Sequence, residues 1–170
     1  MRFSPPAVAL SLAFALAASV SHSAVPDVLS PRAGVLESAG RAALAAGQAE
    51  AATDDFEAAL AIDPGSHLLV MDLAAAAQAN GLQGKAIHYY RVLLTRDPDD
   101  VAALSGEGVA MAQKGALAKA QANLARLKEL CGAECGATAQ LAAVLGGPAR
   151  AQTAMVSVEA VTPKPTVSAN

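Results

Sequence analysis

The chain has 170 residues, of which 54% are hydrophobic and 16% are charged, and this composition suits one small globular unit. Only 3% of the residues are aromatic and Trp is absent, while Ala is abundant, so we expect a thin, all-helical core. The net charge is −3 and no run of Lys or Arg occurs, which argues against nucleic acid as a partner.

The first 23 residues have the pattern of a secretory signal peptide. Met1-Arg2 supplies a positive start, residues 7–20 are apolar and uncharged, and small residues follow. This order is typical of export signals, and the apolar run is short for a membrane span. We expect cleavage before Ala24, a leader over residues 24–30, and a periplasmic or secreted mature protein without a membrane span. An uncleaved anchor helix is the alternative.

A 34-residue period runs through the middle of the chain. The pair Asp-Pro occurs at 63–64 and again at 97–98, 34 positions later. When the chain is laid out at this period from Ala33, small, large and turn-forming residues fall in register without a gap. The aligned sets are Gly40, Ala74 and Gly108; Gly47, Gly81 and Gly115; Ala52, Ala86 and Ala120; Phe56, Tyr90 and Leu124; and Ala59, Leu93 and Leu127.

Each aligned set has a structural reason. Gly tolerates the left-handed backbone that ends a helix, so the second set marks the turn within each unit. Small residues let two helices lie close together, and the large apolar residue that follows fills the gap between units. Pro ends the second helix of a unit. We then expect the next helix to be capped by Ser66 or Asp100, as the first is by Ser30.

These signals predict six helices, near residues 32–46, 49–62, 67–80, 83–96, 101–114 and 117–130. A further helix near 137–145 is expected to cover the last apolar face as a cap. Residues 146–170 contain Gly-Gly, three Pro and no helical period, and are expected to form a disordered tail.

The period and the aligned residues resemble the tetratricopeptide repeat (TPR) over about residues 30–132, and the N-terminal signal suggests an exported bacterial type. The resemblance implies an all-α domain over 31–145: a right-handed superhelical stack of three helix-turn-helix units with a C-terminal capping helix. The sequence departs from the family at its usual Trp and at a later aromatic position. The residues there are Leu36, Val70 and Leu104, then Ala43, Ala77 and Met111, and these smaller side chains predict modest stability per repeat.

In the TPR family the first helix of each unit lines a concave groove that can hold a peptide. The resemblance places nine residues in this groove: Glu37, Arg41, Leu44, Met71, Ala75, Gln78, Ser105, Val109 and Ala112. The family's carboxylate clamp uses Lys, Asn and Arg, whereas its positions here hold Glu37, Arg41, Asp72, Ala102 and Gly106. The clamp is therefore absent, and a helix or an apolar peptide is the expected ligand. A merely shallow channel, or a groove filled by the tail or a second copy, is the alternative.

Cys131 and Cys135, the only cysteines in the chain, lie between the last repeat helix and the cap. In an oxidising compartment two cysteines at short spacing usually pair, and the Gly after each one gives the backbone freedom to do so. A disulfide is therefore the leading expectation. Two free thiols, or a metal or redox site such as one for Cu(I), are the alternatives.

The sequence contains no convincing catalytic motif. Gly106-x-Gly108 lacks the third Gly and the preceding strand of a dinucleotide fingerprint, and Ser105 lacks the Gly neighbours of a nucleophile elbow. His67 and His88 are not grouped with other metal ligands, and the acidic clusters lack EF-hand spacing.

We therefore expect a non-enzymatic scaffold in the bacterial cell envelope that binds a protein or peptide and needs no cofactor or metal. The identity of the partner stays open, and so does the oligomeric state. The alternative is a thiol-redox or copper-handling protein that works through Cys131 and Cys135.

Overall fold

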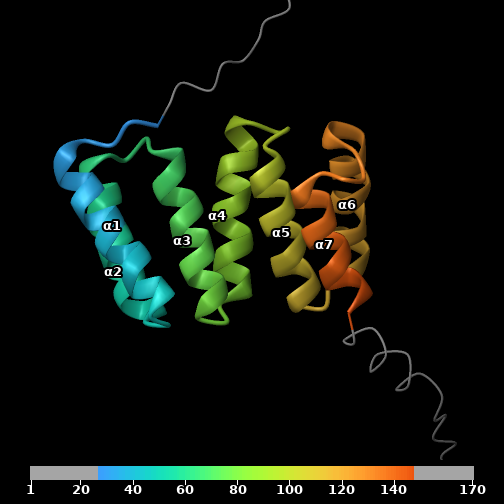
Figure 1. Ribbon diagram of the computed structural model, residues 1–170, viewed down its shortest axis with the longest axis horizontal. Coiled ribbons are helices and arrows are strands. Elements are labelled where there is room, and N and C mark those ends of the chain that lie inside the picture. Colours follow the sequence, from blue (N-terminus) through green and yellow to red (C-terminus); the bar gives the residue numbers. More distant parts are fainter. Residues whose placement is uncertain (1–26, 148–170) are drawn as a thin grey trace, which may run out of the picture.

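The computed structural model describes residues 27–147, and every regular element within them is an α-helix (Figure 1). The helices are α1 (Pro31–Ala45), α2 (Ala49–Ile62), α3 (His67–Ala79), α4 (Gln83–Arg96), α5 (Val101–Gln113), α6 (Leu117–Cys131) and α7 (Gly136–Gly146). The predicted repeat helices and the capping helix are thus confirmed to within a residue at each end. The predicted signal peptide and residues 148–170 of the predicted tail lie outside the described residues.

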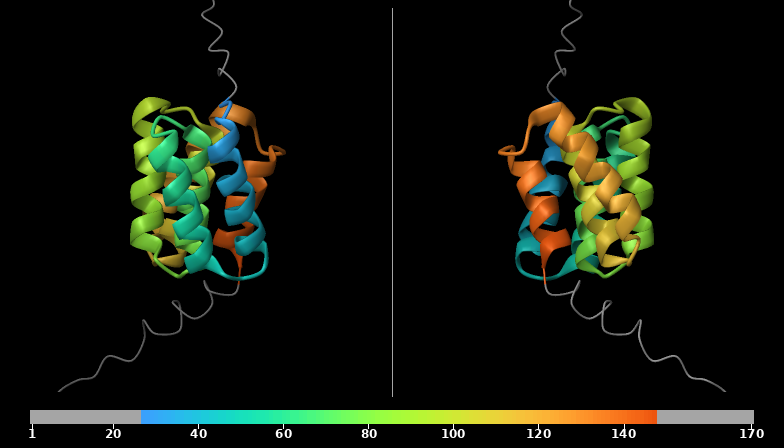
Figure 2. Two further views of the ribbon diagram at one scale, coloured as in Figure 1. Left: turned by 90° about the vertical axis from the view of Figure 1, so that its left-hand side faces the viewer. Right: turned by 90° about the vertical axis from the view of Figure 1, so that its right-hand side faces the viewer.

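The helices form three hairpins, α1–α2, α3–α4 and α5–α6, which stack side by side along the molecule (Figure 1). The first helix of each hairpin belongs to one layer and the second helix to the other. Seen along the stack, α1 and α7 lie on one side and α4 on the other (Figure 2). Because α7 packs on both α5 and α6, it continues the first layer and covers the end of the third hairpin.

The turn inside each hairpin depends on the repeated Gly. Gly47, Gly81 and Gly115 have φ angles of 76°, 72° and 85°, in the left-handed region that other residues rarely adopt. The small residues that follow at positions 52, 86 and 120 are fully buried alanines, so the two helices of each unit approach closely there. The sequence period therefore reports real packing positions.

The predicted N-caps are also confirmed. The Ser66 hydroxyl accepts a hydrogen bond from the Leu69 amide at 3.2 Å, and the Ser30 hydroxyl accepts one from the Ala33 amide at 3.4 Å. Asp100 caps α5 by accepting from two amides at 3.0 Å. Its other carboxylate oxygen lies 2.6 Å from Nε2 of His67 at the start of α3, which ties neighbouring units together.

Two glycines in the first layer make room for large side chains. A Cβ atom on Gly40 would lie 2.5 Å from the ring of Phe56, and one on Gly108 would lie 2.5 Å from Leu141. Phe56 and Leu141 are both fully buried. The cap therefore docks by inserting Leu141 against a glycine of α5, in the way that Phe56 of α2 docks against α1.

A buried carboxylate joins α4, α5 and α6. Glu107 of α5 is only 6% exposed, and it accepts hydrogen bonds from Arg91 at 2.8 Å and from Asn123 at 2.9 Å. Asn123 also donates to the Leu104 carbonyl oxygen. With both oxygens paired, the charge is held inside the stack at a tolerable cost.

Cys131 ends α6 and Cys135 precedes α7, with their Cα atoms 5.7 Å apart and their sulfurs at bonding distance. This Cα separation lies within the usual range for a disulfide, and a bond here would tie the cap to the third hairpin. No helix within residues 27–147 is long and apolar enough to cross a membrane.

Candidate functional site

A cavity of about 530 Å³ opens on the first-helix layer between α3, α5 and α7. We call it the concave groove. Four of the nine predicted groove residues line it: Ala75, Gln78, Ser105 and Val109. The other lining residues are Ala79, Tyr90, Ala102, Gly106, Gln113, Ala137 and Gln140. Small side chains and amides dominate this list, and it contains no Lys or Arg.

A chain of hydrogen bonds runs across the concave groove. The Tyr90 hydroxyl donates to Oε1 of Gln78 at 2.6 Å, and Nε2 of Gln78 donates to Oε1 of Gln113 at 3.4 Å. Burial raises the pKa of Tyr90 to about 12, so its hydroxyl remains a donor up to a higher pH than that of an exposed tyrosine. The hydrogen bonds thus join the side-chain amides of Gln78 and Gln113 across the concave groove.

Tyr90 reaches the groove from the second layer because α5 has a glycine at the crossing point. A Cβ atom on Gly106 would overlap the Tyr90 ring, so no larger residue fits there without a shift. The ring itself is 4% exposed. Gly106 therefore sets the position of the hydroxyl that begins the hydrogen-bond chain.

The capping helix forms one wall of the concave groove. Ser105 of α5 is only 3% exposed, and its hydroxyl donates a hydrogen bond to the Ala137 carbonyl oxygen of α7 at 3.1 Å. Ala137 and Gln140 of α7 line the same cavity. The groove therefore depends on the docking of α7, as well as on the repeats themselves.

The remaining five predicted groove residues do not line this cavity. Arg41 forms ion pairs with Glu37 at 2.6 Å and with Asp72 of α3 at 3.2 Å. Burial raises the pKa of the Asp72 carboxyl, an effect that the Arg41 guanidinium partly opposes. Leu44, Met71 and Ala112 are half-buried and pack against the hydrophobic core. Arg41, the one clamp position with a cation, is thus already engaged by two carboxylates.

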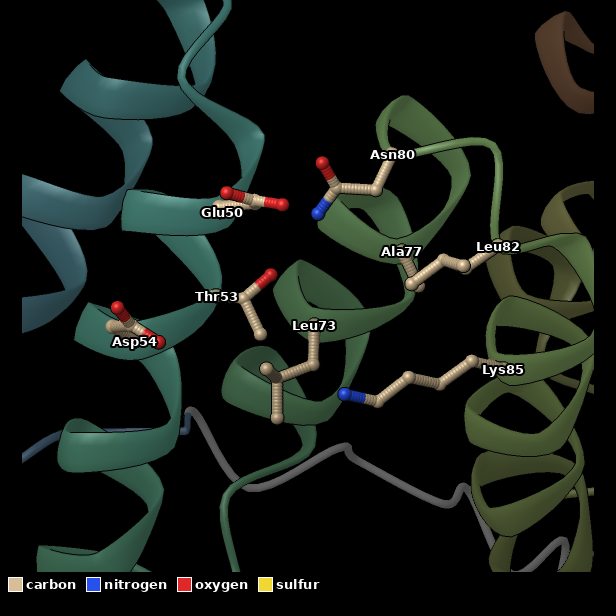
Figure 3. Close-up of a pocket in the computed structure, with 8 residues that line it drawn as sticks. All are labelled: Glu50, Thr53, Asp54, Leu73, Ala77, Asn80, Leu82 and Lys85. Atoms are coloured by element: carbon tan, nitrogen blue, oxygen red, sulfur yellow. The ribbon is translucent and has the colours of Figure 1, made fainter.

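A second cavity, of about 390 Å³, lies between α2, α3 and α4 (Figure 3). Glu50, Thr53 and Asp54 of α2 face Asn80 of α3 across it, while Leu73, Ala77 and Leu82 add apolar surface and Lys85 reaches in from α4. The Lys85 ammonium also lies 3.3 Å from the carboxylate of Glu57. We call this the acidic cavity, and nothing in the sequence period alone indicated a hollow here.

Sequence reasoning missed several residues of the concave groove. Gln113 follows Val109 by one helical turn and could have been found from that spacing. Gln140 and Ala137 could not be found in this way, because the angle at which the cap docks is set by packing and leaves no local pattern in the chain. No group of three or more His, Cys, Asp and Glu side chains is placed to hold a metal ion within the described part of the chain.

No protein-family model matches the sequence, and no curated protein is similar to it in sequence. Solved structures do resemble the fold. The Sgt2 TPR domain from Aspergillus fumigatus is similar with a TM-score of 0.63 and 23% identity, covering 85% of this chain and 95% of that domain.

The first TPR domain of human RPAP3 gives a TM-score of 0.61 and 20% identity, covering 75% of this chain and 98% of the other. The first TPR of Spaghetti (RPAP3), solved with the HSP90 peptide SRMEEVD, gives 0.60 and 22%, covering 78% and 100%. Identities this low establish the architecture and nothing finer. The chain therefore has the all-α stacked fold of tetratricopeptide-repeat domains.

Proposed function

We propose that this chain is an exported, non-catalytic protein-interaction module, and that its concave groove binds a helix or an apolar peptide of a partner in the bacterial envelope. The observation that carries the proposal is the 530 Å³ cavity between α3, α5 and α7. It combines small apolar surface with the fixed amide groups of Gln78 and Gln113, a mixture typical of peptide sites.

One of the solved neighbours supports a peptide ligand in general, and the lining of the groove suggests a different peptide here. The Spaghetti (RPAP3) domain is described as bound to SRMEEVD, a peptide with three acidic side chains. The lining of the concave groove in this chain contains no Lys or Arg, and Arg41 is held by Glu37 and Asp72. An acidic peptide of this kind would find no counter-charge in the concave groove, so a ligand with neutral polar and small apolar side chains fits better.

The groove proposal is tested by photo-crosslinking in the native cell. A photoreactive amino acid at position 113 lies in the concave groove, whereas one at position 121 replaces an exposed glutamine of α6 on the other layer. We expect a discrete protein adduct from position 113 and none of that mass from position 121. Equal adducts from both positions, or none from position 113, would contradict the proposal.

Export is the second part of the proposal, and it rests on the signal-peptide pattern of residues 1–23. An oxidising compartment would also favour the bond between Cys131 and Cys135, whose Cα separation of 5.7 Å suits a disulfide. Fractionation and N-terminal sequencing test this: we expect envelope material that begins at Ala24 and contains no free thiol. A cytosolic protein that retains Met1 would refute it.

A further inference from the structure

A third cavity, of about 310 Å³, lies between α4 and α6 over the C-terminal part of α5. Ile87 and Met111 give it an apolar floor, and its polar lining consists of His88, Arg91, Lys114 and Lys119. We call it the basic cavity. The basic cavity and the concave groove lie on opposite sides of the C-terminal part of α5. Met111 and Lys114 line the basic cavity, whereas Val109 and Gln113 line the concave groove.

The basic cavity is the acidic cavity of Figure 3 moved along by one repeat. Lys85 of the acidic cavity corresponds to Lys119, which keeps its charge, 34 positions later. Three pairs of equivalent lining residues differ in charge: Glu50 and Gly84, Asp54 and His88, and Asn80 and Lys114. Two further positions also change, since Glu107 stands in the place of Leu73 and Arg91 in the place of Glu57, and these two new residues form an ion pair with each other. Apart from that pair, the lining has two carboxylates fewer and one ammonium more than the acidic cavity.

Two helix N-termini add positive potential to the basic cavity. Gly84 lies in the first turn of α4 and Ala116 is the N-cap of α6, and both residues line the cavity. Neither helix has a side-chain cap or an acidic residue in its first turn, whereas α2 at the acidic cavity has Glu50 there. Uncapped amides at a helix start bind anions and repel cations.

Lys114 is an exposed residue that lines the basic cavity close to the start of α4. Its ammonium would be 3.6 Å from a Cβ atom on Gly84, so a cation sits beside the positive end of α4. No carboxylate among residues 27–147 forms an ion pair with Lys114 or Lys119, in contrast to Arg91, which pairs with Glu107 at 2.8 Å. An anion in the cavity would pair with the ammonium groups of Lys114 and Lys119 and with the amides at the start of α4.

We propose that the basic cavity binds a small multivalent oxyanion of the phosphate or polycarboxylate class, independently of the concave groove. The ammonium groups of Lys114 and Lys119 and the free amides at the start of α4 bind the oxygens. Ile87 and Met111 form the floor of the cavity and keep water from the far side of the bound anion. The Glu107 carboxylate is paired with Arg91 and also accepts a hydrogen bond from Asn123, so its charge is already compensated.

The proposal is tested by NMR titration of the purified protein with inorganic phosphate and, separately, with citrate, each at an ionic strength matched with potassium chloride. We expect saturable shifts centred on the amides of Gly84, Lys114 and Lys119 for at least one of the two anions. The anion that binds more tightly identifies the class. Linear, unsaturable shifts with both anions would overturn the proposal.

Two variants with the same loss of charge separate a site from general attraction. Lys114→Gln/Lys119→Gln removes two cations of the cavity and should weaken binding by about tenfold or more. Arg32→Gln/Lys128→Gln removes two unpaired, exposed cations elsewhere and should leave the affinity within about twofold. Equal weakening in the two variants would contradict a built site.

A third variant restores the acidic residue of the neighbouring repeat. Gly84→Glu places a carboxylate where Glu50 lies in the acidic cavity, and its Cβ would meet only ordinary contacts. We expect anion binding to be lost while the helical dichroism and unfolding midpoint are kept or raised, because the first turn of α4 gains an acid. Undiminished binding in folded Gly84→Glu would refute the proposal.

Discussion

Tyr90 links the interior of the stack to the concave groove, and the raised pKa of its hydroxyl predicts how the stability of the fold depends on pH. The pKa in the folded chain is about 12, whereas an unfolded tyrosine titrates near 10. The unfolded chain therefore releases this proton first as the pH rises. The resulting stability is fully present below about pH 10 and is lost between about pH 10 and 12.

The Tyr90→Phe variant should accordingly lose less stability than the parent protein over this range. Between pH 10 and 12 the parent should lose roughly 3 kcal/mol more unfolding free energy than Tyr90→Phe, because each pKa unit corresponds to about 1.4 kcal/mol. Urea unfolding at closely spaced pH values from 9 to 12 measures it. Tyr89→Phe, which leaves the buried hydroxyl in place, should follow the parent; identical curves for all three proteins would exclude the role given to Tyr90.

Two glycine-to-alanine substitutions test close packing at single residues. Gly106→Ala introduces a Cβ into the ring of Tyr90 and should destabilise the fold by about 1–3 kcal/mol. Gly34→Ala, in α1, meets nothing within 4 Å and should stabilise it by about 0.5–1 kcal/mol. Chemical unfolding measures both effects, and a Gly106→Ala variant that is as stable as Gly34→Ala would show that the crossing at Gly106 is looser than described.

At the scale of elements, the docking of α7 depends on one large side chain. Leu141 is fully buried against Gly108, so Leu141→Ala should cost about 2–5 kcal/mol. Val144, which follows Leu141 on α7, is 36% exposed. Val144→Ala should therefore lower the unfolding free energy by less than about 1 kcal/mol. Equal losses of unfolding free energy would mean that α7 is held by something other than this contact.

The cysteine pair between α6 and α7 leads to a separate prediction about stability. If Cys131 and Cys135 are bonded, they close a short loop, and Cys131→Ser/Cys135→Ser should lower the unfolding free energy by about 2 kcal/mol. Added reductant should bring the parent protein to the same value and leave the variant unchanged. If reductant leaves the unfolding curve of the parent protein unchanged, the expected disulfide is absent.

The helices could be read from the sequence because their limits are set by local chemistry. Gly at the turn, Pro after the second helix and Ser or Asp at the cap each act within a few residues, and the 34-residue period repeats them. Glu107 could not be placed in this way. It occupies the position that Leu73 holds one repeat earlier, and its partners Arg91 and Asn123 come from two other helices.

The candidate site was predictable only in part for a similar physical reason. Facing residues on α3 and α5, such as Gln78 and Val109, follow from helical spacing. The contribution of α7 depends on its docking angle, and the engagement of Arg41 by Asp72 depends on the distance between neighbouring units. Contacts between units are set by packing, which a period of residues does not encode.

At the scale of the whole molecule, the stack offers two chemically different faces. The concave groove is neutral and contains alanines and glutamines, and it is formed by the first-helix layer and α7. The other face carries an acidic and a basic cavity at equivalent places in successive repeats. A stack of near-identical hairpins can therefore present distinct surfaces because a few side chains change while the backbone is kept.

Binding of protein ligands in the concave groove is the main functional proposal for this chain. Its most direct test is to select peptides from a random library on the parent protein and to measure their dissociation constants for two variants. Ala75→Arg places a long side chain in the groove, and Ala122→Arg places the same side chain on an exposed position of α6. We predict at least about tenfold weaker binding by Ala75→Arg and unchanged binding by Ala122→Arg. Peptides that bind folded Ala75→Arg as tightly as the parent would contradict the claim.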